Sequence, residues 1–405
     1  MIPTLLRKLH DFSRILVERV LLIAMLAVLA IALAKVFSAF IPDGISYKVG
    51  AEAVDSILQI LATSMLTVTT FSLTVMAATH RSVSSLWTPR AHQILLQDTT
   101  THNVLATFMG AYVYALVAII LRETEVFAGE ELLVLFGMTI LVALLVVAAI
   151  IRWISHLEMF GSLIETGGRI EQRTTEAWRL RAGWPTLGAE PLADVPSGGT
   201  RVVADDSGYL QQIYQDRLQK AAEEADARIW ITQHVGDFIH RGEVLAVTDS
   251  DDEDLAGRIR NNISIGSLRN YAQDPEFGLL CLSEIGSRAM SPGINDPGTC
   301  IDVIGRMSRI ILSFGEVHGG EELRYDRIFV EPFDVGECLE RTFVPLARDS
   351  AGFYEVHRAL RRSLAAIAGH PDPALSAAAL RIHAEAEAIA QEGMDVNDIK
   401  RVLHD

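Results

Sequence analysis

The chain has 405 residues, half of them hydrophobic, and its mean hydropathy of +0.26 is too high for an ordinary soluble protein. Its 51 acidic residues outnumber 35 basic ones, which gives a formal net charge of -16. This balance excludes a nucleic-acid binder, because neutralising phosphate groups takes a basic surface. The apolar content excludes an intrinsically disordered chain.

Charge and hydropathy both divide the chain near residue 183. Residues 1–183 contain 14 basic and 14 acidic side chains, so the whole net charge of -16 lies in the residues that follow. This distribution predicts a membrane half followed by a soluble, acidic half. Three cysteines, Cys281, Cys300 and Cys338, lie far apart without C-x-x-C spacing. They favour neither a zinc site nor a disulfide, and we expect reduced thiols.

Four apolar stretches are long enough to cross a bilayer, whose hydrocarbon core of about 30 Å takes roughly 20 helical residues. They lie at 15–41, 54–79, 103–121 and 131–151. The first follows basic residues and lacks an A-x-A cleavage site after its apolar stretch, so we expect an uncleaved anchor rather than a signal peptide. The lipid bilayer is therefore an expected partner of this half.

Basic residues predict the orientation of these spans. Three of them lie before the first span, two lie between the second and third spans, and one follows the fourth: Arg7, Lys8, Arg14, Arg81, Arg90 and Arg152. Each of the other two connections has a single basic residue, Lys48 or Arg122. Because basic loops stay in the cytoplasm, we expect both termini and the large C-terminal half to be cytosolic.

The second span differs from the others because polar residues follow one face of the predicted helix. At about 100° per residue they form a stripe roughly 120° wide. Its members are Asp55, Ser56, Gln59, Thr63, Thr67, Thr70 and Thr74.

Two interpretations of this stripe stay open. Copies of the helix could surround an aqueous path, with Asp55 attracting cations at its mouth. The pore-lining candidates are then Asp55, Gln59, Thr63, Thr67, Thr70 and Thr74. Alternatively, the hydroxyls bond to carbonyls of their own helix and help helices pack, which is the general behaviour of such residues in membranes. Asp55 and Gln59 fit this second interpretation least well.

Between the second and third spans, His80, His92 and His102 are spaced by twelve and ten residues, which predicts no metal site. Thr88-Pro89 predicts the start of a short helix in this connector. After the fourth span, apolar positions continue at helical spacing, and we expect a break at Gly167-Gly168. Pro and Gly are frequent at 183–199, which predicts a linker.

Residues 201–248 alternate strand and helix signals, with strands around Gly236-Asp237 and Arg241-Gly242. The pattern V-G-D-F-I-H-R-G-E-V-L is similar to the hairpin of biotinyl and lipoyl hammerhead domains, in which glycines adopt positive φ in tight turns. Those domains carry their group on a lysine, and this chain has no lysine between Lys220 and Lys400. We therefore expect no covalent cofactor here, only a small β module at 184–250.

The segment 264–311 contains Asp274-Pro275 and Asp296-Pro297, and each step predicts a capped helix start. The loop between them, 291–297, could also bind a phosphate or carboxylate through backbone N–H groups at a helix N-terminus. Ligand-binding candidates are Arg269, Arg288, Ser291, Gly293, Asn295 and Asp296. Further on we expect a strand near Arg327 and helices within 336–369 and 374–392.

None of the common phosphate-loop, zinc-protease, nucleophile-elbow, calcium-loop or dinucleotide fingerprints occurs in the chain. The sequence brings no nucleophile, base and orienting group together. We therefore do not expect an enzyme. An activity in the 264–302 segment would be the exception.

The motifs S-M-L-T-V-T-T-F-S-L, Q-D-P-E-F-G and S-P-G-I-N-D-P together resemble the bacterial membrane-protein family called domain of unknown function 2254. The resemblance runs from the first span to about residue 345. It implies a multi-pass protein of the bacterial inner membrane with a cytosolic domain, and no assigned activity.

The expected fold is four transmembrane helices followed by a cytosolic α+β region with the hammerhead-like module. The expected domains are the transmembrane helices at 1–152, a helical connector at 153–183, the β module at 184–250 and a mostly helical domain at 251–405. Two functions stay open. One is a homo-oligomeric pore or transport protein, lined by the second span and regulated by the cytosolic domain. The other is a non-conducting scaffold or sensor that binds a partner or small anion through the 291–297 loop.

Overall fold

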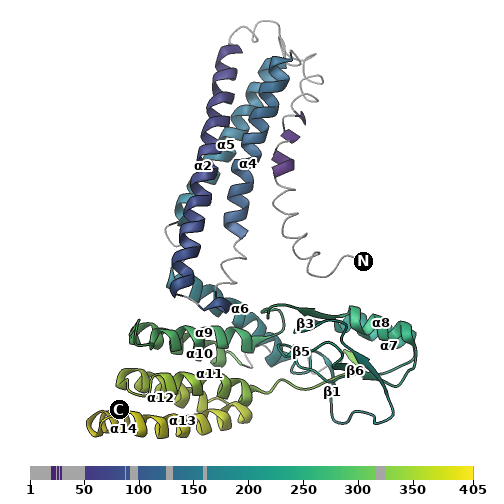
Figure 1. The fold of residues 1–405 in the computed structure, drawn as a ribbon, viewed down its shortest axis with the longest axis vertical. Coiled ribbons are helices and arrows are strands. Elements are labelled where there is room, and N and C mark those ends of the chain that lie inside the picture. The colour runs from purple at the N-terminus through teal and green to yellow at the C-terminus, as the bar shows by residue number, and fades with distance from the viewer. Residues whose placement is uncertain are drawn as a thin grey trace. The chain divides into compact units, whose positions relative to one another are not determined.

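The computed structural model describes residues 20–23, 25–26, 28–29, 51–86, 88–91, 99–124, 131–157, 162–314 and 324–404. The chain divides into two compact units (Figure 1). The first unit consists of 1–86 and 95–165, and the second consists of 87–94 and 166–405.

In the described part of the first unit, three helices are long and apolar enough to cross a membrane. They are α2 (Ala51–Leu86), α4 (Thr99–Glu123) and α5 (Glu131–Leu157). These helices confirm the second, third and fourth predicted spans as candidate membrane helices. Most of the first predicted span, 15–41, lies outside the described residues, so the count of four stays a prediction, as does the orientation.

Apolar side chains fill the space between α2, α4 and α5, and the core includes Leu58, Phe108 and Leu135. The described part of the predicted first span lies against α4. A Cβ added at Gly110 would meet Ile23 Cβ at 2.7 Å, so glycine is what allows this close approach.

The second unit begins with residues 88–91 of the connector. The Thr88 hydroxyl accepts a hydrogen bond from the Ala91 N–H at 3.3 Å, and Pro89 is the first helical residue. This contact confirms the predicted helix start at Thr88-Pro89. The His92 side chain lies outside the described residues.

Helix α6 (Leu163–Gly183) runs without interruption through Gly167 and Gly168. The predicted break at these glycines is therefore wrong, since α5 ends at Leu157 and the next helix begins at Leu163. The glycines serve packing instead, because a Cβ at Gly167 would lie 3.3 Å from Arg306 Nε. That guanidinium donates to Glu171 of α6 at 2.9 Å.

The described residues of the second unit include eight strands, which form two sheets. The five-stranded sheet has the order β1 (Ala189–Pro191), β8 (Tyr325–Val330), β4 (Ile229–Ile231), β6 (Val244–Thr248) and β2 (Thr200–Val203). β8 pairs in parallel with both of its neighbours, and the other two pairs are antiparallel. The three-stranded sheet has the order β5 (Phe238–Ile239), β3 (Gly208–Ile213) and β7 (Ile263–Gly266), all antiparallel.

Two sequence predictions about this region can be compared with the sheets. The positive φ expected at Gly236 and Gly242 is present, at 104° and 86°. The strand expected near Arg327 is β8, second in the five-stranded sheet. β5 lies between β4 and β6 in the chain but pairs with β3, whereas β4 pairs with β6. This segment is therefore not a simple hairpin. The sheets also take β7 and β8 from outside 184–250, because strand pairing joins segments distant in sequence.

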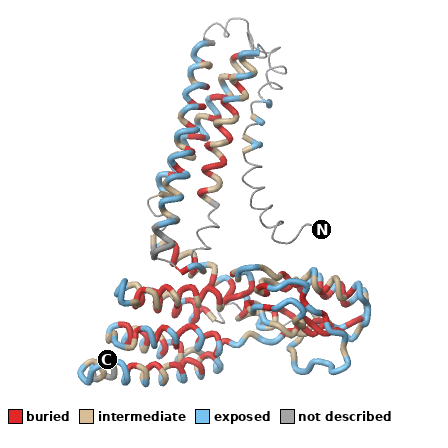
Figure 2. The backbone as a smooth tube through the Cα atoms, in the orientation of Figure 1, coloured by how far each residue is buried: buried red, intermediate tan, exposed pale blue. Residues whose placement is uncertain are grey.

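Two helices pack against the strands, and the others stack on one another beside the sheets (Figure 1). Two short ones, α7 (Gln215–Glu224) and α8 (Glu253–Asn261), accompany the strands. Six more follow: α9 (Pro275–Ala289), α10 (Pro297–Leu312), α11 (Val335–Asp349), α12 (Tyr354–Ala368), α13 (Pro373–Gly393) and α14 (Val396–His404). In Figure 2 these helices carry both buried and exposed residues, as expected for helices that pack on one face.

Aspartates cap six of these helices in the described part of the chain: α8, α9, α10, α11, α13 and α14. Asp274 accepts from the Phe277 N–H at 3.0 Å, and Asp296 accepts from the Thr299 N–H at 3.1 Å. Both predicted Asp-Pro caps are thus confirmed. Asp334 and Asp372 cap α11 and α13 in the same manner.

Candidate functional site

The polar stripe of α2 lies on the exposed side of this helix within the first unit. Gln59, Thr63, Thr67, Thr70 and Thr74 are exposed, whereas Leu58, Met65 and other apolar residues of α2 are buried.

Hydroxyls of the stripe bond to their own helix. Thr67 donates to the Thr63 carbonyl at 2.9 Å, and Thr74 donates to the Thr70 carbonyl at 2.9 Å. Thr70 makes bonds of the same kind. At one end of the helix, Asp55 lies 3.5 Å from Arg122 of α4. This ion pair offsets the negative charge that would otherwise attract cations to Asp55.

The 291–297 loop uses most of its N–H groups internally. The Ser291 carbonyl accepts from Ile294 and Asn295, and the Asp296 N–H donates to the Ala289 carbonyl at 2.8 Å. Asn295 has a positive φ of 52°, which asparagine tolerates better than most residues. The Gly293 side of the loop is open, with nothing within 4 Å of an added Cβ.

Asp296 is the residue of this loop with the clearest structural role. It accepts from the N–H and the hydroxyl of Thr299, and these bonds lower the pKa of its carboxyl. Arg288 lies at the end of α9 that precedes the loop. The ligand-binding candidate Arg269 does not join them, because it contacts Asp274 and Glu276 at the opposite end of α9, roughly 20 Å away by helical rise. The loop therefore has less capacity for an anion than its sequence suggests.

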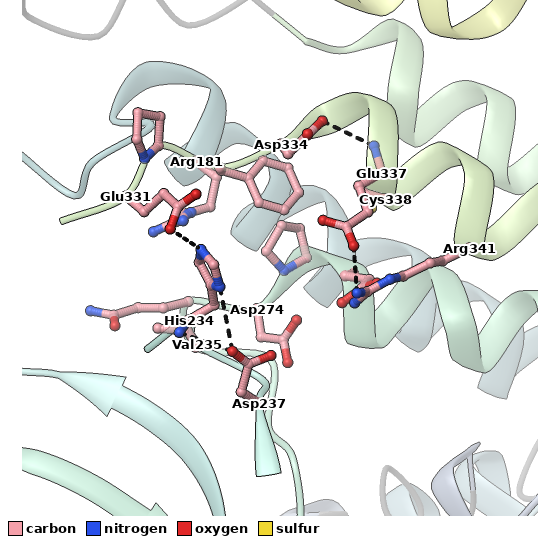
Figure 3. Close-up of a pocket in the computed structure, with 15 residues that line it drawn as sticks. Arg181, His234, Val235, Asp237, Asp274, Glu331, Asp334, Glu337, Cys338 and Arg341 are labelled. Atoms are coloured by element: carbon pink, nitrogen blue, oxygen red, sulfur yellow. Dashed lines mark hydrogen bonds and ion pairs between the residues drawn. The ribbon is translucent and has the colours of Figure 1, made fainter. Parts of the chain in front are cut away.

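A pocket elsewhere in the second unit gathers more charged side chains than either predicted site. Its cavity is about 120 Å³. The walls come from the end of α6, the β4–β5 loop, the start of α9, the segment after β8, and α11 (Figure 3). Six carboxylates line it: Asp237, Asp274, Glu276, Glu331, Asp334 and Glu337. No group of His, Cys, Asp and Glu in the described part of the chain is arranged to hold a metal ion.

The innermost carboxylates are held by Arg269, which lies just behind the pocket wall. Its guanidinium donates two hydrogen bonds to Asp274, at 2.7 and 2.8 Å, and one to Glu276 at 3.0 Å. Asp274 is 3% exposed, and this burial raises the pKa of its carboxyl despite the bonds from Arg269. Glu276 also accepts a hydrogen bond from Arg341 of α11 at 3.2 Å. Both carboxylates are therefore paired.

The carboxylates on the α11 side are paired as well. Asp334 accepts from the backbone N–H groups of Gly336 and Glu337 as the cap of α11. The Glu337 carboxylate accepts from Arg341 at 2.5 Å. Nearby, burial holds the pKa of the Cys338 thiol well above its usual range, so this thiol stays protonated.

On the other side of the pocket, His234 lies between two carboxylates (Figure 3). Its Nδ1 is 3.4 Å from Asp237, and its Nε2 is 3.0 Å from Glu331. The hydrogen bond to Asp237, followed by the charge of Glu331, raises the pKa of the imidazole, although partial burial opposes this. The same bond lowers the pKa of Asp237.

Arg181 is the one charged group of the pocket with unused buried hydrogen-bond donors. It lies near the end of α6 and is 5% exposed, and its Nε and one terminal nitrogen have no acceptor. The guanidinium lies over the Phe333 ring, 5.3 Å from the centroid. Burial lowers the pKa of Arg181 to about 10, while the charge of Asp274 opposes this shift. The group stays a cation at neutral pH.

Sequence reasoning missed this pocket, although one signal for it exists. Ile170, Thr174, Ala177, Trp178 and Arg181 follow helical spacing and are all buried on one face of α6. An arginine on an otherwise apolar helix face is costly unless something pairs with it. The other walls come from segments that are separated by up to 160 residues, and no spacing rule brings them together.

The three membrane-spanning candidates and the mixed α/β region with two sheets define a membrane protein with a large folded domain outside its spans. The chain belongs to the family of predicted membrane proteins DUF2254, which matches residues 15–366. It is also similar to uncharacterized proteins of Mycobacterium bovis and Mycobacterium tuberculosis, with 26% identity over 276 residues, which is 64% of this chain and 51% of each relative. The chain thus spans about half the length of these relatives. No solved structure matches it.

Proposed function

We propose that the protein is a membrane-anchored receptor for a small polar ligand, which binds in the pocket beside Arg181 with an oxygen acceptor on that guanidinium. In this proposal the spans anchor the receptor in the bacterial inner membrane, and the mixed α/β unit is cytosolic. The unused donors of Arg181 carry the proposal, because every carboxylate that lines the pocket already has a partner.

Energetic reasoning supports a ligand at this position. A buried donor without an acceptor costs about 1–3 kcal/mol, and more when the group is charged. An oxygen acceptor that replaces the missing partner recovers this free energy and gains a charge-assisted hydrogen bond. Ligand binding therefore recovers the free energy that the empty pocket loses by leaving these donors without an acceptor.

The test is the thermal unfolding of the full chain in detergent with acetate, inorganic phosphate and L-alanine as probes. At ten times its dissociation constant, a probe that binds only the folded state raises the melting temperature by about 3–6 °C. We expect at least one probe to give such a rise with wild type and none with Arg181→Met. Arg348→Met, at a side chain that is 65% exposed, is the matched control and should behave as wild type. Equal shifts in both arginine variants, or none with wild type, would contradict the proposal.

A second function, the homo-oligomeric pore, is favoured by the exposure of the α2 stripe within the first unit. Gln59 cannot bond its own helix in the way that threonine does, and hydrocarbon is a poor solvent for an amide. Contact with the same helix of a second copy, around a water-filled path, would solvate it. The paired Asp55 and the self-bonded threonines make this the weaker proposal.

Ion flux through the purified protein in liposomes tests the pore. Thr67→Trp is expected to reduce flux at least tenfold, because the indole fills the path. Leu144→Trp on α5, where the native side chain is 62% exposed, controls for bulk on a lipid-facing side and should leave flux unchanged. Absence of flux from wild type, or equal losses in both variants, would count against a pore.

A further inference from the structure

We infer that the ligand of the Arg181 pocket is a small zwitterion of the α-amino acid class, with its carboxylate on Arg181 and its ammonium on Glu331 and Asp237. This inference rests on the proposed function, since it assumes that Arg181 holds a ligand. It names the ligand class, which the unused donors of Arg181 alone do not decide.

The size of the pocket limits the ligand first. Its cavity of about 120 Å³ is slightly smaller than the roughly 150 Å³ cavity that accommodates benzene in another protein. A molecule of about six heavy atoms fits this space. Nucleotides and other large phosphorylated compounds would extend far outside it.

The charge of the walls limits the ligand next. Six carboxylates line the pocket, against the lining cations Arg181 and Arg341, with Arg269 behind the wall. A dianion such as phosphate would accept hydrogen bonds from Arg181, but the surrounding carboxylates would repel it. A simple cation would be attracted by those carboxylates, but it would leave the Arg181 guanidinium without an acceptor. A ligand that carries both charges gains a hydrogen bond from Arg181 and uses the acceptor sites that the paired carboxylates still have.

The carboxylates differ in their remaining capacity to accept hydrogen bonds. Asp274 is buried and bound twice by Arg269, so it has little capacity left. Glu331 and Asp237 are 55% and 42% exposed, and each shares His234 as its side-chain partner. An ionised carboxylate has about four acceptor sites, so both can still receive an ammonium. Figure 3 shows Arg181, His234 and Glu331 together on one side of the pocket.

The apolar part of the lining suits the carbon skeleton of such a ligand. Val235, Pro275, Pro332 and Phe333 lie among the charged residues. Their surfaces can contact a Cβ or a short side chain while the charged groups hold the two ends. This combination of few polar anchors and apolar walls is typical of small-molecule sites.

A matched set of probes tests the zwitterion with the full chain in detergent. L-alanine carries both charges, propionate lacks the ammonium, and ethylamine lacks the carboxylate. We expect calorimetric titration to give L-alanine an affinity at least tenfold higher than that of either half, with no L-alanine binding to Arg181→Met. Glu331→Gln should weaken L-alanine about tenfold and leave propionate unchanged, whereas Arg348→Met should bind as wild type.

The outcomes separate this inference from the proposed function. If propionate binds as tightly as L-alanine and both depend on Arg181, the receptor proposal stands and the zwitterion is wrong. If Glu331→Gln weakens propionate and L-alanine equally, the placement of the ammonium is wrong. If neither L-alanine, propionate, acetate nor phosphate shows binding that Arg181→Met removes, both proposals are overturned.

Discussion

Replacing Gly278 with alanine is expected to lower the free energy of unfolding of the mixed α/β unit by about 3 kcal/mol or more. Gly278 lies in α9, and an added Cβ would be 1.8 Å from the Thr174 hydroxyl oxygen and 2.7 Å from two other atoms of that side chain. Thr174 is fully buried in α6 and donates to the Ile170 carbonyl at 2.6 Å, so it cannot move aside. Denaturant unfolding of the detergent-solubilised chain measures the loss.

The matched control is Gly257→Ala in α8, where nothing lies within 4 Å of the added Cβ. This change should stabilise the protein by about 0.5–1 kcal/mol, because alanine is the better helix former. Thr174→Ala in the Gly278→Ala background removes the closest atom and should recover part of the loss. Similar effects of both glycine substitutions would show that α6 and α9 do not pack closely at Gly278 and Thr174.

Local chemistry is what the sequence predicted well. Asp-Pro steps define helix starts through contacts within three residues, and both expected caps are present. Long apolar runs define membrane helices in the same local manner, and α2, α4 and α5 follow them. The prediction at Gly167-Gly168 is wrong because a glycine pair can either break a helix or allow a close contact. Only the position of Arg306 distinguishes these two roles, and that position is not visible in the local sequence.

The candidate site could not be predicted in the same way because its geometry is non-local. Arg269 is one of the ligand-binding candidates that the sequence offers for the 291–297 loop, yet a 15-residue helix separates it from that loop. The pocket itself depends on β8 pairing in parallel with β4, which brings Glu331 beside the loop that holds His234. Parallel pairing between segments about 100 residues apart leaves no periodic signal in either of them.

Replacing Arg269 with methionine is expected to cost about 3–5 kcal/mol of the free energy of unfolding at neutral pH. The substitution leaves Asp274 and Glu276 without their shared guanidinium, and Asp274 is 3% exposed. An unpaired carboxylate in such a place is costly because desolvation disfavours its charged form. Denaturant unfolding at pH 7 measures the cost. Lys220→Met, in an exposed ion pair with Glu224, is the control and should change stability by less than about 0.5 kcal/mol.

The pH dependence of this loss tests its electrostatic origin. Burial already raises the pKa of Asp274, and without Arg269 that pKa should rise further. An acid whose pKa is higher in the folded than in the unfolded state binds protons preferentially when folded, so stability rises as the pH falls through the folded pKa. The deficit of Arg269→Met relative to wild type should therefore shrink between pH 7 and pH 5. Asp274→Asn in the same background removes the charge while keeping a capping oxygen, and should recover part of the loss at pH 7. A deficit that is constant with pH and unchanged by Asp274→Asn would mean that Arg269 acts through packing alone.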